Sequence, residues 1–215
     1  MIKAVLFDMD GLLVDSETLA MKVVIKVCQE LGIPLTGGQE KNVVGVTAEH
    51  FFRNLMSSDD AAIQVALDKF TEVYEQLIKT ELVIFDGAKT LPAELKAKGL
   101  RIALVSGSTP AQIDIVLNQL GTKDLFEVII SEKDITHSKP SPEGYLLAAE
   151  KLGLSPDECL VIEDAEAGVA AAKAAGIKVI GVHNAGDQDL SAADAIYDTL
   201  SELTPEAIFA ILPTD

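Results

Sequence analysis

The sequence predicts an α/β fold: a doubly wound parallel sheet with an inserted α-helical domain. Short apolar runs alternate with helical patterns over most of the 215 residues. These runs are continuous rather than alternating, which is typical of parallel strands covered by helices on both faces. One long helical stretch interrupts the alternation after the first run. With 48% hydrophobic residues, the chain can also bury the large core that such a fold requires.

Five apolar runs are expected to form strands, and a short strand and a closing helix should follow near residues 195–197. The runs cover residues 2–7, 101–106, 126–130, 159–162 and 178–182. The helices between them have recognisable ends. Thr109 and Ser141 each precede a proline, a typical start of a helix. Glycines that easily adopt the left-handed conformation follow the last periodic residues at positions 121, 153 and 176.

The spacing of the first two runs indicates an insertion. The first run ends near Phe7, whereas the next begins near Arg101. Between them, Ser16 is a candidate N-cap and Gly32 a stop of one helix, and residues 61–79 carry apolar side chains at helical spacing. We therefore expect a core domain at residues 1–15 and 82–215 and a helical domain at residues 16–81.

Composition limits the partners. The formal net charge of −17 weighs against binding to nucleic acid or to anionic membranes, because both need a basic surface. No stretch approaches the roughly 20 apolar residues of a membrane-spanning helix. Cys28 and Cys159 lie in apolar segments without metal-ligand spacing and are expected to be buried thiols. We expect a cytoplasmic monomer or weak homo-oligomer that binds neither nucleic acid nor membranes.

Polar side chains gather where the strands end. In open α/β sheets, ligands bind beyond the carboxyl ends of the strands. The residues that should meet there are Asp8, Asp10, Ser106, Gly107, Lys139, Glu163 and Asp164. Four carboxylates beside one lysine would repel one another unless a hard cation neutralises them, and Mg²⁺ suits such oxygen ligands. This combination is typical of a phosphoryl-transfer site.

Four segments resemble the motifs of a known family. FDMDGLLVDSE, LVSGS, KPSPEGY and VIEDAEAG, in this order and spacing, resemble the four motifs of the haloacid dehalogenase superfamily of phosphotransferases. The resemblance extends over essentially the whole chain and implies the Rossmann-like core of that superfamily. The helical insertion resembles the cap domain of the beta-phosphoglucomutase-like branch, which also contains many sugar phosphate phosphatases.

The resemblance implies roles for the carboxylates. Asp8 matches the nucleophile that forms an aspartyl phosphate and also binds Mg²⁺. Asp10 matches the general acid and base, and its backbone carbonyl matches a metal ligand. Asp164 matches a direct metal ligand, and Glu163 could bind the metal directly or through water. Gly11 would allow the tight turn beside the metal.

The resemblance also implies a phosphate-binding set. Ser106 and the Gly107 N–H group match donors to the phosphoryl oxygens. Lys139 matches the residue that balances the charge of the nucleophile and the phosphoryl group. Contacts to the rest of the substrate would come from the cap domain, for which Glu17, Thr47, Glu49 and Arg53 are the candidates.

Departures from the mutase pattern favour hydrolysis. The mutase branch uses a His, an Arg and a Lys of the cap, and this chain has Ala20, Ala48 and Phe70 at the matching positions. The sequence therefore predicts a Mg²⁺-dependent phosphatase that acts on a small phosphorylated substrate, best a sugar phosphate. A beta-phosphoglucomutase-type mutase and an inorganic pyrophosphatase are the alternatives, and a noncatalytic phospho-sensor is a distant one. The presence of Asp10 argues against halide chemistry.

Overall fold

The chain divides into two compact units. The computed structural model describes residues 1–43, 46–56, 60–184, 186 and 188–211. One unit, called the core unit, comprises Met1–Val14 and Ile84–Asp215, and the other, called the helical unit, comprises Asp15–Val83. The chain passes between them at β2 (Val14–Asp15) and β3 (Val83–Ile84), which pair as a two-stranded sheet.

The core unit contains a six-stranded sheet with the order β5-β4-β1-β6-β7-β8, and its neighbouring strands are parallel. The strands are β1 (Ala4–Phe7), β4 (Arg101–Val105), β5 (Val128–Ile130), β6 (Cys159–Glu163), β7 (Lys178–Val182) and β8 (Ala195–Tyr197). The order extends from β1 in both directions, so the topological switch point lies where β1 meets its neighbours β4 and β6. The predicted fold class is confirmed.

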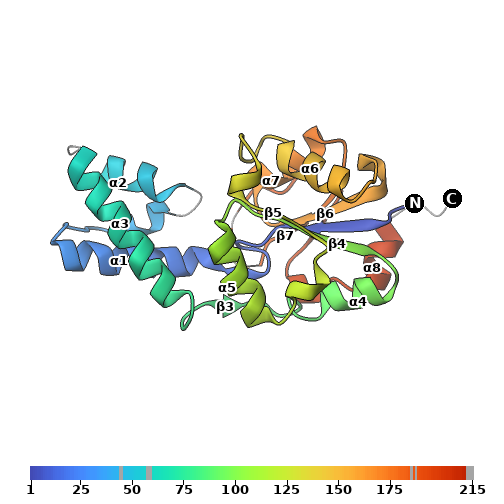
Figure 1. Ribbon diagram of the computed structural model, residues 1–215, viewed down its shortest axis with the longest axis horizontal. Helices are drawn as coiled ribbons and strands as arrows, with labels where there is room; N and C mark the ends of the chain where they lie inside the picture. Colours follow the sequence, from blue (N-terminus) through green and yellow to red (C-terminus); the bar gives the residue numbers. More distant parts are fainter. Residues whose placement is uncertain (44–45, 57–59, 185, 187, 212–215) are drawn as a thin grey trace. The chain divides into compact units, whose positions relative to one another are not determined.

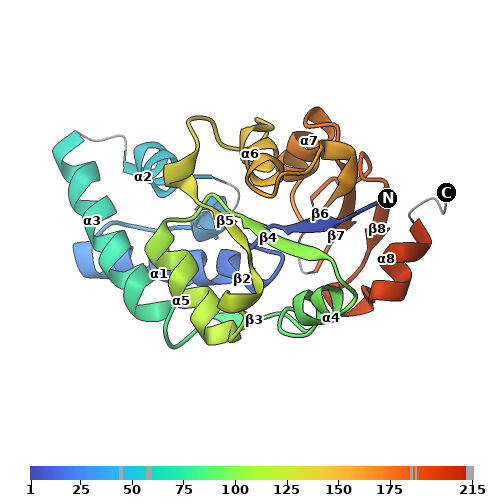
Figure 2. The same ribbon diagram turned by 45° about the vertical axis from the view of Figure 1, so that its right-hand side comes forward.

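Helices cover both faces of this sheet. They are α4 (Leu91–Ala97), α5 (Pro110–Leu120), α6 (Glu143–Lys151), α7 (Glu166–Ala174) and α8 (Pro205–Ile211), with short 3-10 helices at Lys123–Leu125, Glu132–Asp134, Pro156–Glu158 and Leu200–Glu202. Figures 1 and 2 show α6 and α7 on one face and α4 and α8 on the other. Leu6, Val161, Tyr145 and Val169 belong to the apolar core between the sheet and the first pair of helices. Because helices cover both faces of the sheet, its strands are apolar on both sides, which explains the continuous apolar runs of the sequence.

The ends of two helices differ from the prediction. Thr109 caps α5 as expected. In contrast, α1 (Ser16–Leu31) is capped by Asp15, whose carboxylate accepts a hydrogen bond from the Thr18 N–H at 2.9 Å, and not by Ser16. The N-cap of α6 is Pro142, which makes no side-chain bond, whereas Ser141, one residue earlier, accepts a hydrogen bond from the Glu143 N–H at 3.3 Å. At α1, Asp15 takes the place of Ser16 as the cap because a charged acceptor binds an N–H more strongly than a hydroxyl does.

The helical unit is built from α1, α2 (Ala48–Met56) and α3 (Asp60–Leu77), with a 3-10 helix at Gln39–Val43. Both α1 and α2 contact α3. Phe70 lies between two other aromatic rings of this unit, with its ring centroid 6.2 Å from that of Phe52 and 5.8 Å from that of Tyr74. The residue therefore contributes to the packing of the unit. Among the described residues, no helix has the length and apolar character needed to cross a membrane.

Candidate active site

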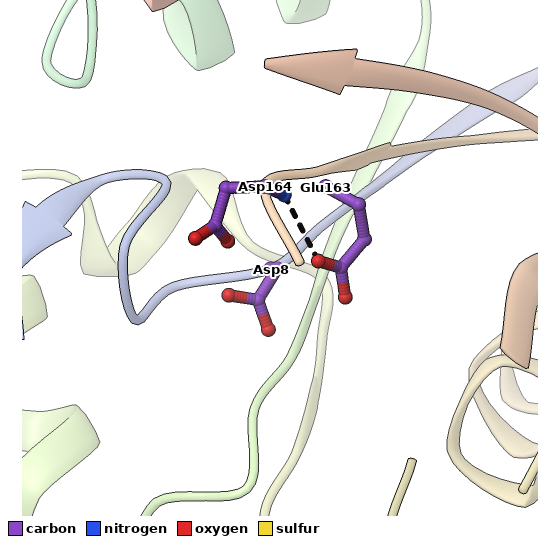
Figure 3. A group of neighbouring side chains, drawn as sticks. All are labelled: Asp8, Glu163 and Asp164. Carbon is purple, nitrogen blue, oxygen red and sulfur yellow. Dashed lines mark hydrogen bonds between the residues drawn. The ribbon is translucent and has the colours of Figure 1, made fainter. Parts of the chain in front are cut away.

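Three buried carboxylates meet at the carboxyl ends of β1 and β6. Asp8 follows β1 directly, and its N–H donates to the Ile162 carbonyl of β6 at 3.1 Å. Glu163 is the last residue of β6, and Asp164 follows it. One oxygen atom from each of the three side chains lies within 4.8 Å of the others, and Figure 3 shows the three carboxylates directed toward one space.

Two glycines allow the backbone to approach these carboxylates. Gly11 has a φ of +83°, and a Cβ atom there would lie 2.0 Å from Oδ2 of Asp164. A Cβ atom at Gly168 in α7 would lie 1.8 Å from Oε1 of Glu163. Neither position can accept a side chain without displacing a carboxylate. Gly11 was expected beside the metal, whereas Gly168 was not singled out although it ends the fourth motif.

Lys139 joins two of the carboxylates. Its ammonium donates to Oδ1 of Asp8, to Oε1 of Glu163 at 2.5 Å and, at the longer distance of 3.4 Å, to the carbonyl of Val105. Asp8 and Glu163 are 5% and 0% exposed, respectively, so these ion pairs are shielded from water. The structure thus brings together a predicted nucleophile, a predicted charge-balancing lysine and two predicted metal ligands.

Tyr145, a residue that the sequence analysis did not select, completes this cluster. Its hydroxyl donates to Oε1 of Glu163 at 2.6 Å. The same ring lies under Lys139, whose Nζ is 5.3 Å from the ring centroid, within the range of a cation–π contact. Tyr145 belongs to the quoted segment KPSPEGY, but an aromatic residue on the apolar face of a helix is ordinarily assigned to the core.

Asp10 is held by two hydroxyls of the loop after β4. Both Ser106 Oγ and Ser108 Oγ donate to its Oδ2, at 2.9 and 2.8 Å. Ser106 itself is fixed by its N–H, which donates to the Ile130 carbonyl of β5 at 3.0 Å. Ser108 is a second residue that the sequence analysis missed, although it ends the segment LVSGS.

Asn184 supports the turn that follows Asp10. Its Nδ2 donates to the carbonyls of Gly11 and Leu12 at 2.8 and 3.0 Å, and its Oδ1 accepts from the Leu200 N–H at 3.1 Å. Its φ of +46° is unusual for a residue other than glycine. No motif of the sequence marked this asparagine.

Burial and charge shift the pKa values of the cluster. The pKa of Asp8 is raised to about 8, chiefly because the carboxyl group is buried; Lys139 lowers this pKa, and the charges of Glu163 and Asp10 add to the rise. Burial alone would lower the pKa of Lys139, but the carboxylates of Asp8 and Glu163 outweigh it and raise that pKa well above its ordinary value. Burial, with Glu163, raises the pKa of Tyr145 well above its ordinary value. Lys139 stays charged and Tyr145 stays a donor.

The donor set fits a divalent cation. With all groups ionised, the three carboxylates and Lys139 carry a formal charge of −2 in a buried space. Carboxylate oxygens are the ligands that hard divalent cations prefer. Such a cation would favour the ionised form of Asp8, which burial disfavours.

A cavity of about 110 Å³ lies beside this cluster. Ser106, Gly107 and Lys139, which are the three predicted phosphate-binding residues, all contribute to its lining, together with Tyr145. The structure therefore places the predicted phosphate ligands around one space in the core unit.

The predicted substrate contacts of the cap belong to the helical unit. Glu17 lies in the first turn of α1. Thr47 precedes α2, and its Oγ1 accepts from the His50 N–H at 3.2 Å. Arg53 pairs with Glu49 and Asp60, at 2.9 and 2.8 Å. A substrate contact of these side chains stays a prediction.

Comparisons with known proteins agree with this geometry. The model of the haloacid dehalogenase-like hydrolase family matches residues 5–182. The chain is 35% identical over 215 residues to "Putative phosphatase YhcW" of Bacillus subtilis, which covers 99% of this chain and 96% of that protein. It is 30% identical over 186 residues to a phosphorylated carbohydrates phosphatase of Thermotoga maritima, 83% of either chain.

The matched lengths differ among relatives. A chloroplastic protein of Arabidopsis thaliana, SUPPRESSOR OF QUENCHING 1, is 36% identical over 187 residues, but the match covers 84% of this chain and only 18% of that protein. Among solved structures, beta-phosphoglucomutase from Clostridium difficile has a TM-score of 0.81 at 26% identity and covers 98% of this chain and 97% of its own. The resemblance found in the sequence and the expectation of a hydrolytic enzyme are thereby confirmed, and the chain belongs to the haloacid dehalogenase-like hydrolase family.

Proposed function

We propose that this protein is a magnesium-dependent phosphatase that hydrolyses a small sugar phosphate through an aspartyl phosphate on Asp8. The observation that carries the proposal is the buried cluster at the switch point of the sheet. There, Asp8 lies against Lys139 and beside Glu163 and Asp164. A carboxylate, a fixed ammonium and a site for a divalent cation are the parts that phosphoryl transfer to an enzyme carboxylate requires.

The first half-reaction uses Asp8 as nucleophile. One of its carboxylate oxygens attacks phosphorus as the bond from phosphorus to the ester oxygen breaks. Lys139, through the N–H that faces Asp8, and the Gly107 N–H bind the phosphoryl oxygens. The Ser106 hydroxyl joins them by turning away from Asp10, to which it donates in this structure. Asp8, Asp164 and the Asp10 carbonyl would hold a divalent cation, which would neutralise charge and polarise the phosphoryl group.

Asp10 serves both half-reactions. Because the hydroxyls of Ser106 and Ser108 both donate to Oδ2, we assign the transferred proton to Oδ1. This proton passes to the leaving ester oxygen in the first step. In the second step the same carboxylate takes a proton from the water that attacks the phosphorus of the aspartyl phosphate. The bond from phosphorus to the Asp8 oxygen breaks, so that orthophosphate leaves and the Asp8 carboxylate is restored.

Hydrolysis is favoured over transfer to a second sugar oxygen. A mutase must hold a bisphosphate, for which the branch uses three cationic or imidazole side chains of the cap. This chain has Ala20, Ala48 and Phe70 at those positions. Phe70 packs among the aromatic rings of the helical unit. The sugar phosphate class is supported by the Thermotoga maritima relative, which is named a phosphorylated carbohydrates phosphatase.

The proposal extends to the setting of the enzyme. A net charge of −17 favours a small phosphorylated substrate, bound at a local positive centre, over nucleic acid or a membrane. We propose a cytoplasmic enzyme that acts as a monomer or weak homo-oligomer.

Phosphate release by the purified protein tests the function. The substrates are a panel of sugar phosphates, p-nitrophenyl phosphate, pyrophosphate and nucleoside monophosphates, each with excess Mg²⁺ and again with EDTA. The proposal predicts release from a narrow set of sugar phosphates that EDTA abolishes. Release that persists in EDTA, isomerised sugar phosphate without release, or release from pyrophosphate alone would contradict it.

A further inference from the structure

The carboxylate of Glu163 has no lone pair left for a metal ion. An ionised carboxylate offers about four lone-pair positions. On Oε1, Glu163 accepts from Lys139 at 2.5 Å and from the Tyr145 hydroxyl at 2.6 Å. On Oε2 it accepts from the N–H groups of Asp164 and Ala165, at 3.0 and 3.2 Å. These four donors occupy all of the positions.

The ammonium of Lys139 is equally constrained. It has three N–H donors, and its acceptors are Asp8, Glu163 and the Val105 carbonyl. Val105 and Glu163 are the last residues of β4 and β6, so both acceptors are fixed by the sheet. Asp8 is the acceptor at the reacting end, so two of the three contacts fix where the ammonium lies relative to the nucleophile.

The surroundings hold Glu163 in this one arrangement. Gly168 leaves room for its Oε1, and any Cβ atom there would collide with it. Tyr145 is 1% exposed and belongs to the apolar core between the sheet and the α6 and α7 helices, so packing fixes the position of its hydroxyl. Because an ionised carboxylate only accepts hydrogen bonds, the Tyr145 hydroxyl is the donor in this contact.

We propose that Glu163 and Tyr145 form a positioning unit for Lys139, and that Glu163 is not a direct ligand of the metal. The Tyr145 hydroxyl sets the orientation of the Glu163 carboxylate, and that carboxylate sets the ammonium against Asp8 and the phosphoryl group. Direct ligation falls to Asp8, Asp164 and the Asp10 carbonyl. This inference rests on the proposed function, because it assigns residues within the same site.

The test compares metal binding with anion binding in Tyr145→Phe, which removes one hydroxyl and leaves every charge in place. Tyr197→Phe, in β8, is the matched control. Mn²⁺ binding is measured by electron paramagnetic resonance, and orthophosphate binding by calorimetry at saturating Mg²⁺. Asp164→Asn provides the behaviour of a direct ligand, and Lys139→Ala removes the group that is positioned.

The proposal predicts that Tyr145→Phe weakens orthophosphate binding and lowers kcat by about tenfold, as is found when a residue that orients the groups around a metal is removed. Its Mn²⁺ affinity should stay within about twofold of that of the wild-type protein, whereas Asp164→Asn should lower the Mn²⁺ affinity by more than about tenfold. In the Lys139→Ala background, Tyr145→Phe should have no further effect on orthophosphate binding, because the two residues act as one unit. Tyr197→Phe should change neither affinity.

Three results would overturn the inference. Loss of Mn²⁺ affinity in Tyr145→Phe comparable to that in Asp164→Asn would make Glu163 a direct ligand. Unchanged orthophosphate binding and kcat in Tyr145→Phe would show that Tyr145 serves only to pack the core. An equal effect of Tyr145→Phe with and without Lys139 would remove the link between them. This last comparison holds even if the single variant is less stable.

These measurements separate the inference from the proposed function. Both affinities are read without turnover. If the wild-type protein binds Mn²⁺ and orthophosphate but hydrolyses no ester, the phosphatase proposal fails, while the binding pattern still decides the positioning role. If turnover is present and the binding pattern is absent, only the inference fails.

Discussion

Gly168→Ala is predicted to destabilise the protein, against the ordinary effect of this substitution. In a helix interior, alanine is favoured over glycine by about 1 kcal/mol, and Gly168 lies within α7. Here, however, the new Cβ atom would lie 1.8 Å from Oε1, 2.0 Å from Cδ and 2.4 Å from Oε2 of Glu163. Such distances require the carboxylate to move.

The magnitude follows from what that movement breaks. Displacing the carboxylate disrupts at least two of its four hydrogen bonds, each worth about 1.5–3 kcal/mol because the acceptor is charged. Subtracting the gain in helix propensity leaves a net loss of about 2–5 kcal/mol. This is a large part of the roughly 5–15 kcal/mol that stabilises a typical domain. Because Lys139 loses its support, kcat should fall by about 100-fold.

The assay is urea denaturation of Gly168→Ala beside the wild-type protein, with phosphate release measured on the same preparations. Ala170→Gly, at an exposed position of the same helix, calibrates the propensity effect and should lower the free energy of unfolding by about 1 kcal/mol without changing kcat. A Gly168→Ala protein as stable as the wild type, or more stable, would refute the close approach of the helix to Glu163.

Three further predictions concern the loops and the acid stability. Ser108→Ala removes one of the two hydroxyl donors to Asp10, so kcat should fall by about tenfold with little change in KM; a changed KM at constant kcat would contradict this role. Asn184→Ala removes the bonds to the turn after Asp10 and should lower the free energy of unfolding by about 1–3 kcal/mol, as measured in urea; unchanged stability would show that the turn holds itself. Hydrogen bonds from Lys3 and from the Ser155 N–H and hydroxyl lower the pKa of Glu158 from 4.5 to about 2. The ionised Glu158 carboxylate therefore stabilises the fold above about pH 4.5, and this contribution is lost as the pH falls toward 2. Glu158→Gln should therefore be less stable than the wild type near neutral pH, and the difference should shrink in acid; a difference independent of pH would contradict the assignment.

The sequence was sufficient to predict the fold class and the residues at the ends of the strands. Continuous apolar runs occur where both faces of a sheet are covered, and the structure covers them on both faces. Because parallel strands end at one edge, Asp8, Ser106 and Asp164 could be assigned to one crevice from their positions alone. This reasoning needs only the local pattern of apolar residues and the rules of sheet topology, and the pattern can be read from a single sequence.

The missed residues act through contacts between distant parts of the chain. Ser108 meets Asp10 across 98 positions, and Asn184 meets Gly11 across 173. Tyr145 is a core aromatic by pattern, and it is one, but its hydroxyl also reaches Glu163. No local pattern distinguishes a packed tyrosine from one that donates to a buried carboxylate. The cap of α1 is a different case, because Asp15 and Ser16 are neighbours that can both cap a helix, and the sequence pattern alone did not distinguish them.

The central claim is that Asp8 carries the phosphoryl group. Acid quench during turnover with excess Mg²⁺ and a hydrolysed sugar phosphate, followed by peptide mass spectrometry, tests it most directly. The account predicts one phosphoryl group on the peptide that contains Asp8, absent from the Asp8→Asn protein and from samples treated with EDTA. Full turnover with no phosphorylated peptide, or turnover that survives in Asp8→Asn, would contradict it.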